Sequence, residues 1–128
     1  MDEPDKALDD IARQIVDSAF AVHVALGPGL LESVYEQCLA YEIQSRRLIV
    51  TRQVMLPVHY RDIVIEAGFR IDLLVSDLVV VEIKAVEKIL PVHEAQLLTY
   101  LKLSGKRLGL LINFNVPRIK DGIKRLVG

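Results

Sequence analysis

The chain has 128 residues, about the size of one domain, and 52% of them are hydrophobic, enough for a buried core. Its formal net charge of −1 gives no overall attraction to nucleic acid, and no apolar run approaches the roughly 18 residues of a membrane span. The acidic start "MDEPDKALDD" is unlike a secretory signal or transit peptide, and a single cysteine, Cys38, favours a reducing cytoplasm over a disulfide framework.

Charge is distributed unevenly along the chain. Residues 1–45 hold nine acidic and two basic side chains, whereas residues 101–128 hold seven basic side chains and one acidic one. This asymmetry indicates either a basic face for nucleic acid or an ordinary solvated surface. No repeat, low-complexity segment or linker divides the chain, so we expect a single domain over residues 1–128.

Hydrophobic periodicity predicts the elements in chain order. An amphipathic helix over about 4–26 ends at Gly27, so residues 1–27 are expected to form an N-terminal helix packed on the core. A second helix covers about 30–46. Three strand-like segments follow at 50–60, 63–75 and 78–86, with turns at Arg61-Asp62 and around Ser76-Asp77.

The last third of the chain begins with a helix at about 92–104. The segment "RLGLLINF", residues 107–114, is apolar on both faces and is expected to be a central strand, and Pro117 opens a short last helix over 118–127. This order predicts an α/β fold. Three antiparallel strands and a fourth, reached by a helical crossover, form one mixed four-stranded sheet flanked by helices.

Charged residues lie inside the apolar strand pair "GFRIDLLVSDLVVVEIKAV", residues 68–86. Because strand side chains alternate, Arg70 and Asp72 share one face of the second strand, and Glu82 and Lys84 share one face of the third. Register decides whether these faces coincide. A two-residue loop would pair Asp72 with Val81, whereas a three-residue loop at 76–78, or a bulge, would pair it with Glu82.

If the two acids meet, their charges repel and burial adds a desolvation penalty, and a divalent cation relieves both. Mg²⁺ or Mn²⁺ would then take oxygens from Asp72, Glu82 and the backbone carbonyl of Ile83, with Lys84 on the same side. The competing interpretation is a salt-bridge ladder of Glu82, Lys84, Asp72 and Arg70 on a half-exposed sheet face.

Two helices add weaker signals. Glu32, in "GLLESVYEQ", lies in the first turn of the second helix, where the helix dipole alone also favours an acid. Gln96 and Tyr100, in "EAQLLTYLKLSG", lie one turn apart on the side opposite a leucine stripe. They belong either to a site or to an ordinary exposed helix face.

At this point the residues resemble a known family. "GLLESVYE", with Gly29, Glu32 and Tyr35 in the defining places, is similar to the signature of the GxxExxY proteins. "GFRIDLLVSDLVVVEIKAVE", "EAQLLTYLKLSG" and "RLGLLINFN" are similar to that family's other blocks, so the resemblance runs from about residue 15 to the C-terminus. The family is grouped with the PD-(D/E)XK nuclease superfamily. The resemblance therefore implies a restriction-endonuclease-like αβββαβ core, with an extra N-terminal helix here and a metal site on the sheet.

The resemblance also implies a role for each side chain. Asp72 would be the motif's aspartate, Glu82 and Lys84 its E-x-K, Glu32 the acid from the first core helix, and Gln96 the polar residue from the later helix. Ile71 stands where the superfamily's motif has a proline before the aspartate.

The favoured function is a metal-dependent nuclease that hydrolyses phosphodiester bonds of DNA or RNA. Mg²⁺ or Mn²⁺ would be held by Asp72, Glu82, the Ile83 carbonyl and Glu32. Lys102, Lys106 and Arg107 would contact the nucleic-acid backbone. The alternatives are a non-catalytic nucleic-acid- or protein-binding module of the same fold, and a structural protein whose charged cluster is only a salt-bridge network. A homodimer or a protein partner is expected to supply specificity, because the small core leaves little room for a recognition domain.

Overall fold

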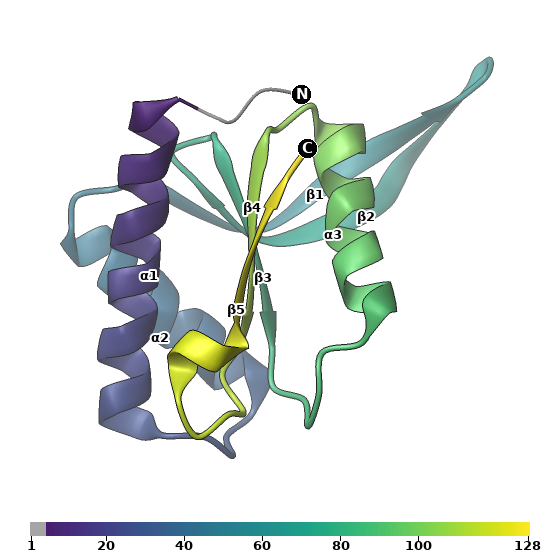
Figure 1. The fold of residues 1–128 in the computed structure, drawn as a ribbon. Coiled ribbons are helices and arrows are strands. Elements are labelled where there is room, and N and C mark those ends of the chain that lie inside the picture. The colour runs from purple at the N-terminus through teal and green to yellow at the C-terminus, as the bar shows by residue number, and fades with distance from the viewer. Residues whose placement is uncertain (1–4) are drawn as a thin grey trace.

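Helices cover both faces of one five-stranded sheet in the computed structural model, which describes residues 5–128 (Figure 1). In chain order the elements are α1 (Lys6–Leu26), α2 (Glu32–Ser45), β1 (Val50–Tyr60), β2 (Ile63–Val75), β3 (Val79–Lys84), α3 (Pro91–Ser104), β4 (Leu108–Asn113), a 3-10 turn (Ile119–Gly122) and β5 (Ile123–Val127). The predicted bounds of the first two strands are confirmed. Among the described residues, no helix is both long enough and apolar enough to cross a membrane.

The sheet has the order β1-β2-β3-β4-β5. β1, β2 and β3 form an antiparallel meander, as predicted, and α3 then carries the chain to β4, which lies parallel to β3. Every residue of β4 is buried, which confirms that this strand is central. The mixed sheet flanked by helices is therefore the expected α/β fold, with one strand more than predicted.

The additional strand corrects the sequence prediction of a last helix over 118–127. Only Ile119–Gly122 is helical, as a 3-10 turn, and Ile123–Val127 forms β5, antiparallel to β4. The reason lies partly at Gly122, where a Cβ atom would overlap the backbone carbonyl oxygen of Asn113. A buried strand such as β4 also needs hydrogen-bond partners on both edges, and β5 supplies them. The sheet consequently has five strands instead of four.

Helix ends follow from local capping. The side chain of Asp5 accepts a hydrogen bond from the backbone N–H of Leu8 at 3.0 Å and starts α1. Gly27, at φ 71°, ends that helix, and Gly105, in the left-handed conformation at φ 73°, ends α3. Pro91 occupies the first turn of α3, where its missing N–H costs nothing.

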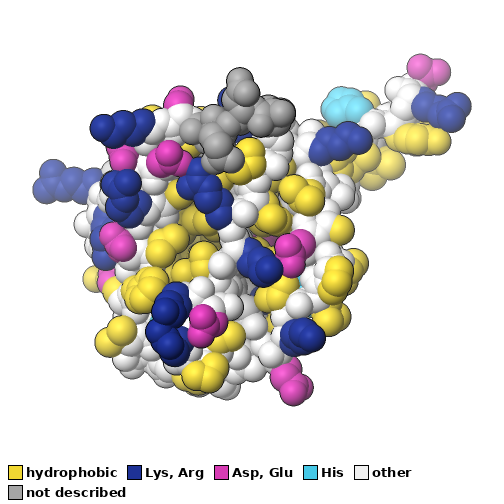
Figure 2. Space-filling model, viewed as in Figure 1, with side chains coloured by type: hydrophobic (Ala, Val, Ile, Leu, Met, Phe, Trp, Pro, Cys, Tyr) yellow, Lys and Arg dark blue, Asp and Glu magenta, His cyan; other side chains and the backbone are white. Residues whose placement is uncertain are grey.

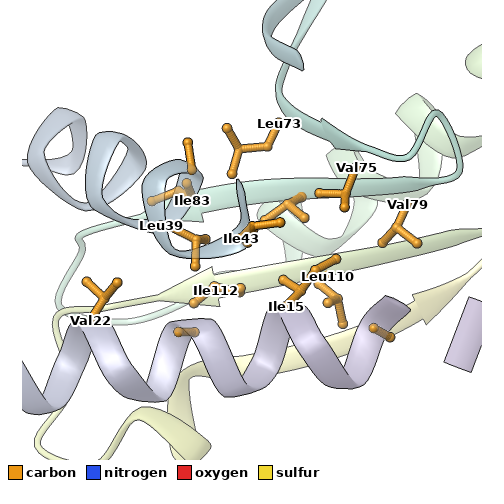
Figure 3. Close-up of a cluster of buried hydrophobic side chains, with 14 of the residues drawn as sticks. Ile15, Val22, Leu39, Ile43, Leu73, Val75, Val79, Ile83, Leu110 and Ile112 are labelled. Carbon is orange, nitrogen blue, oxygen red and sulfur yellow. The ribbon is translucent and has the colours of Figure 1, made fainter. Parts of the chain in front are cut away.

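Two hydrophobic clusters hold the layers together. One joins α1 and α2 to the sheet and includes Ile15, Leu39, Leu73 and Ile83 (Figure 3). The other lies under α3 and includes Ile71 and the α3 residue Leu97. Burial of such a side chain contributes about 1.5–3 kcal/mol, so these clusters fix the position of the sheet between its helices.

The outer halves of β1 and β2 project from the body as a two-stranded arm (Figure 1). Pairing shifts between Leu56 and Val58, and Gly68 allows close approach, because a Cβ there would overlap Val58. Beyond this point the arm exposes apolar side chains, seen in yellow in Figure 2, that include Tyr60 and Ile63. The base of the arm forms one wall of the candidate site.

Candidate active site

Asp72 and Glu82 meet where the backbone ladder between β2 and β3 ends. Paired residues run from Val75 with Val79 to Leu73 with Val81, and one further step places Asp72 opposite Glu82. The Asp72 N–H donates to Oε2 of Glu82 at 2.9 Å, and the Ile83 N–H donates to Oδ2 of Asp72 at 2.9 Å. Each carboxylate thus accepts a backbone hydrogen bond from the opposite strand.

Of the registers that the sequence leaves open, the structure has the one that a shared site for Asp72 and Glu82 requires. Because Val75 pairs with Val79, the connection is the three-residue loop 76–78, one of the two arrangements that bring the acids together. Ser76 and Asp77 adopt left-handed conformations at φ 53° and 57°. Ser and Asp are among the residues that occur most often in tight turns, Asp also being enriched in this conformation.

β2 twists about Asp72. Strict alternation would place Ile71 and Leu73 on the same face of the sheet. Instead, Ile71 packs in the cluster under α3, whereas Leu73 packs in the cluster under α1 and α2. The carboxylate between them points toward β3, where it meets the Ile83 N–H.

Burial disfavours the ionised form of these acids. Glu82 is only 4% exposed, and desolvation, followed by the charge of Asp72, raises its pKa to about 8. Desolvation also raises the pKa of Asp72, against the lowering effect of the Ile83 N–H, and it raises the pKa of Glu32. Lys84 favours the charged form of all three acids. Without a cation, the site therefore favours protonated acids, because Lys84 only partly offsets the cost of burying their charge.

The contacts of Tyr35 fix the position of Glu32 at the site. The Tyr35 hydroxyl donates to the Gly27 carbonyl oxygen at 2.6 Å and accepts from the Leu30 N–H at 3.1 Å. Its ring stacks on Phe114, with centroids 4.6 Å apart. These contacts fix the loop between α1 and α2, so Glu32 begins α2 at a defined place.

One pocket of about 380 Å³ contains all five predicted catalytic residues. It is lined by Glu32, Met55, Ala67, Phe69, Arg70, Asp72, Glu82, Lys84, Gln96 and Tyr100. Gln96 and Tyr100 come from α3, and the Tyr100 ring lies 4.8 Å from the ring of Phe69. Desolvation and the nearby acids raise the pKa of the Tyr100 hydroxyl, so it remains a hydrogen-bond donor.

The predicted nucleic-acid contacts lie elsewhere. Lys102, Lys106 and Arg107 line a different pocket, at the C-terminal end of α3. Nζ of Lys106 lies 3.4 Å from Oδ1 of Asp77, in the loop between β2 and β3. The structure does not bring this basic group together with the carboxylates.

The sequence alone gives no catalytic or binding role to Arg70, in the pocket wall, or to a group of side chains outside the pocket lining. Arg70 enters the sequence analysis only as a salt-bridge partner, yet it is the arginine in the pocket wall. Glu36 on α2 is only 8% exposed and contacts Arg52 and Gln53 of β1. These contacts depend on how α2 packs against β1, which no local pattern reveals. For Arg70 the sequence does carry a signal, because strand alternation places it on the same face as Asp72.

The chemistry of the acids fits a divalent cation that needs few protein ligands. Within residues 5–128, no three His, Cys, Asp or Glu side chains are grouped closely enough to hold a metal ion. Mg²⁺ commonly takes one or two carboxylates and completes its shell with water and substrate phosphate. Asp72 and Glu82 supply that number of carboxylates. The pKa of about 8 at Glu82 indicates a carboxylate whose charge lacks a close partner, which a cation would provide.

A meander of three strands, a helical crossover to a parallel strand, and an Asp with a Glu-x-Lys in one pocket define a restriction-endonuclease-like fold. Residues 9–126 match the family model described as the PD-(D/E)XK nuclease superfamily, and the chain belongs to that superfamily. No curated protein and no solved structure matches it.

Proposed function

We propose that this protein is a nuclease that hydrolyses phosphodiester bonds of DNA or RNA and requires Mg²⁺ or Mn²⁺. Membership of the PD-(D/E)XK superfamily supports a nucleic-acid substrate. The observation that carries the proposal is the opposition of Asp72 and Glu82 in a pocket that also holds Lys84 and Gln96. Two acids can hold a divalent cation that activates water, and a nearby amine can stabilise negative charge on the phosphate.

The chain's own residues have distinct roles in this proposal. Asp72 and Glu82, with the Ile83 carbonyl, would hold the cation, which when bound lowers the pKa of water and stabilises charge on the phosphate. Lys84 would orient the attacking water and donate to a phosphate oxygen. Gln96 and Arg70 would position the phosphate from the two walls of the pocket, and Glu32 would hold water beside the two acids.

Lys84 lies near enough to act electrostatically on the acids, but among residues 5–128 no close ion pair supports the salt-bridge interpretation. Ion pairs there join Arg13 to Asp10, Arg52 to Glu36, Lys106 to Asp77, Lys124 to Glu94 and Arg125 to Asp9. Neither Asp72 nor Glu82 takes part in one. A structural network of charges would require these acids to be paired with Lys84 or Arg70.

The direct test is cleavage of single- and double-stranded DNA and RNA with Mg²⁺ or Mn²⁺. We expect Lys84→Ala to lose about 100-fold or more of the rate, while Lys120→Ala, an exposed lysine outside the pocket, retains it. Equal cleavage by wild type and Lys84→Ala would mean that a contaminant or another site is responsible.

Two observations favour the non-catalytic alternative. The two carboxylates already accept backbone hydrogen bonds, and no third acid completes a metal-holding group among residues 5–128. A module that only binds would shift nucleic acid in a gel without cleaving it under any metal condition. Cleavage that requires metal and Lys84 excludes that alternative.

Finer assignments belong to the same proposal. We group the chain with the GxxExxY proteins because Gly29, Glu32 and Tyr35 match their signature, and the hydrogen bond from Tyr35 to the Gly27 carbonyl oxygen supports a structural role for the signature tyrosine. The predicted cytoplasmic location rests on the single cysteine, and the predicted homodimer or protein partner stays a prediction.

A further inference from the structure

Glu36 lies on α2 one turn beyond Glu32 and is only 8% exposed. A buried carboxylate needs hydrogen-bond partners, and within residues 5–128 the partners of Glu36 come from β1. Its Oε2 accepts from Nε and Nη2 of Arg52 at 3.2 and 2.9 Å, and its Oε1 accepts from the side-chain amide of Gln53. Glu36 thus fixes two neighbouring side chains of the edge strand.

Gln53 has an unusual backbone. Its φ of 52° lies in the left-handed region, which a non-glycine residue seldom adopts within a strand. Such a conformation persists when surrounding contacts hold it, and it is frequent at functional sites. Arg52 pairs with Leu73 and Val54 with Ile71, so Gln53 lies opposite Asp72.

The amide of Gln53 can bond two acids at once. A side-chain amide carries two N–H donors, whereas an ionised carboxylate only accepts, so the nitrogen of Gln53 must face Glu36. Gln53 lies opposite Asp72 in the sheet, and its side chain lowers the pKa of that carboxyl, which opposes the larger effect of burial. Gln53, Asp72 and Glu82 consequently form a row across three adjacent strands.

We propose that Gln53, held in place by Glu36 and Arg52, is a positioning residue that orients the Asp72 carboxylate toward a divalent cation. The inference rests on the proposed function, because it presumes that Asp72 binds the metal. Residues that hydrogen-bond a metal ligand from outside orient it, and their loss commonly costs 10- to 100-fold in affinity.

The test is calorimetric titration of the full chain with Mn²⁺, combined with the melting temperature of the metal-free protein. Gln53→Met keeps an unbranched side chain of similar length but lacks the amide, and we expect about tenfold weaker Mn²⁺ binding. Gln53→Gly also lacks the amide but adopts φ 52° without strain. We therefore expect Gln53→Gly to bind Mn²⁺ as weakly as Gln53→Met does, and to melt at a higher temperature than Gln53→Met. Gln44→Met, at an exposed position on α2, is the matched control and should change neither quantity.

The possible outcomes distinguish a positioning role for Gln53 from a structural role, and from failure of the proposed function. Wild type that binds Mn²⁺ while Gln53→Met and Gln53→Gly bind it equally well overturns the positioning role and leaves the proposed function standing. If both variants lose Mn²⁺ affinity only to the extent that they lose melting temperature, the role of Gln53 is merely structural. That result also overturns the positioning role. Wild type that binds no Mn²⁺ overturns the proposed function and this inference together.

Discussion

Asp72 and Glu82 are tied to each other's strands, since the Asp72 N–H donates to the Glu82 carboxylate and the Asp72 carboxylate accepts from the Ile83 N–H. The two acids therefore take the place of backbone hydrogen bonds in the sheet. Their separation is set by strand spacing and not by a loop. Sites built on strands hold geometry more accurately than sites on loops, which suits a pair of metal ligands.

Stability of the metal-free protein should fall as pH rises from about 5 to 8. The pKa of Glu82 is about 8 in the folded state against 4.5 ordinarily, so between these values the folded protein binds the additional proton. Ionisation above pH 4.5 then favours the unfolded chain, and the loss is complete above the folded pKa. One pKa unit corresponds to about 1.4 kcal/mol, so we expect a decrease on the order of 2–4 kcal/mol in the free energy of unfolding.

Glu82→Gln is the control for this pH dependence, because its side chain stays neutral throughout. Urea unfolding at pH 5, 6, 7 and 8, with a chelator present, should give a flatter profile for the variant than for wild type. Identical profiles for the two proteins would show that Glu82 does not carry the shifted pKa.

Metal binding should release a proton. At pH 7 a carboxyl with a pKa of about 8 is mostly protonated, and a bound cation requires the ionised form. We expect roughly one proton per metal ion at pH 7 and fewer at pH 9. Calorimetric titration in buffers of different ionisation enthalpy measures this number, and a value near zero at pH 7 would contradict the assignment of Glu82 as a ligand.

The sequence contains the site's residues but only part of its geometry. Asp72, Glu82 and Lys84 stand out because charge is costly within an apolar strand pair, and spacing then reduces the register to two arrangements. The choice between the two registers depends on the left-handed backbone at Ser76 and Asp77. Serine and aspartate favour such a turn but do not by themselves determine it. The three-residue loop that results is what brings the acids together.

Other features could not be read from local patterns. The spacing of Ile119, Ile123 and Leu126 is helical, yet close approach at Gly122 and the open edge of β4 make residues 123–127 a strand. The contacts of Glu36 with Arg52 and Gln53 join residues 16 and 17 positions apart, so they appear only once α2 lies against β1. Tertiary packing decides both cases.

Tyr35→Phe should separate the two functions of that residue. The variant keeps the ring stacked on Phe114 but loses the hydroxyl that joins Gly27 and Leu30. We expect a loss of about 1 kcal/mol in the free energy of unfolding. We also expect slower cleavage, because Glu32 is no longer held at the start of α2. Full activity together with the stability loss would show that Glu32 needs no such placement.

Two sets of basic residues should affect different kinetic constants. Arg70 lines the pocket, so Arg70→Ala should lower both the maximal rate and the affinity, and it should reduce the salt dependence of binding by about one ion. Replacing Lys102, Lys106 and Arg107 together should weaken binding while sparing the maximal rate, since they line another pocket. Cleavage kinetics at several salt concentrations distinguish the two. The proposal for this second group fails if its loss leaves the salt dependence unchanged.

The most direct measurement is anomalous scattering from crystals of the protein grown with Mn²⁺. We expect one Mn²⁺ peak within bonding distance of carboxylate oxygens of both Asp72 and Glu82, on the side of the pocket where Lys84 lies. A well-ordered site that shows no such peak at saturating Mn²⁺, or a metal bound to neither acid, would contradict this expectation.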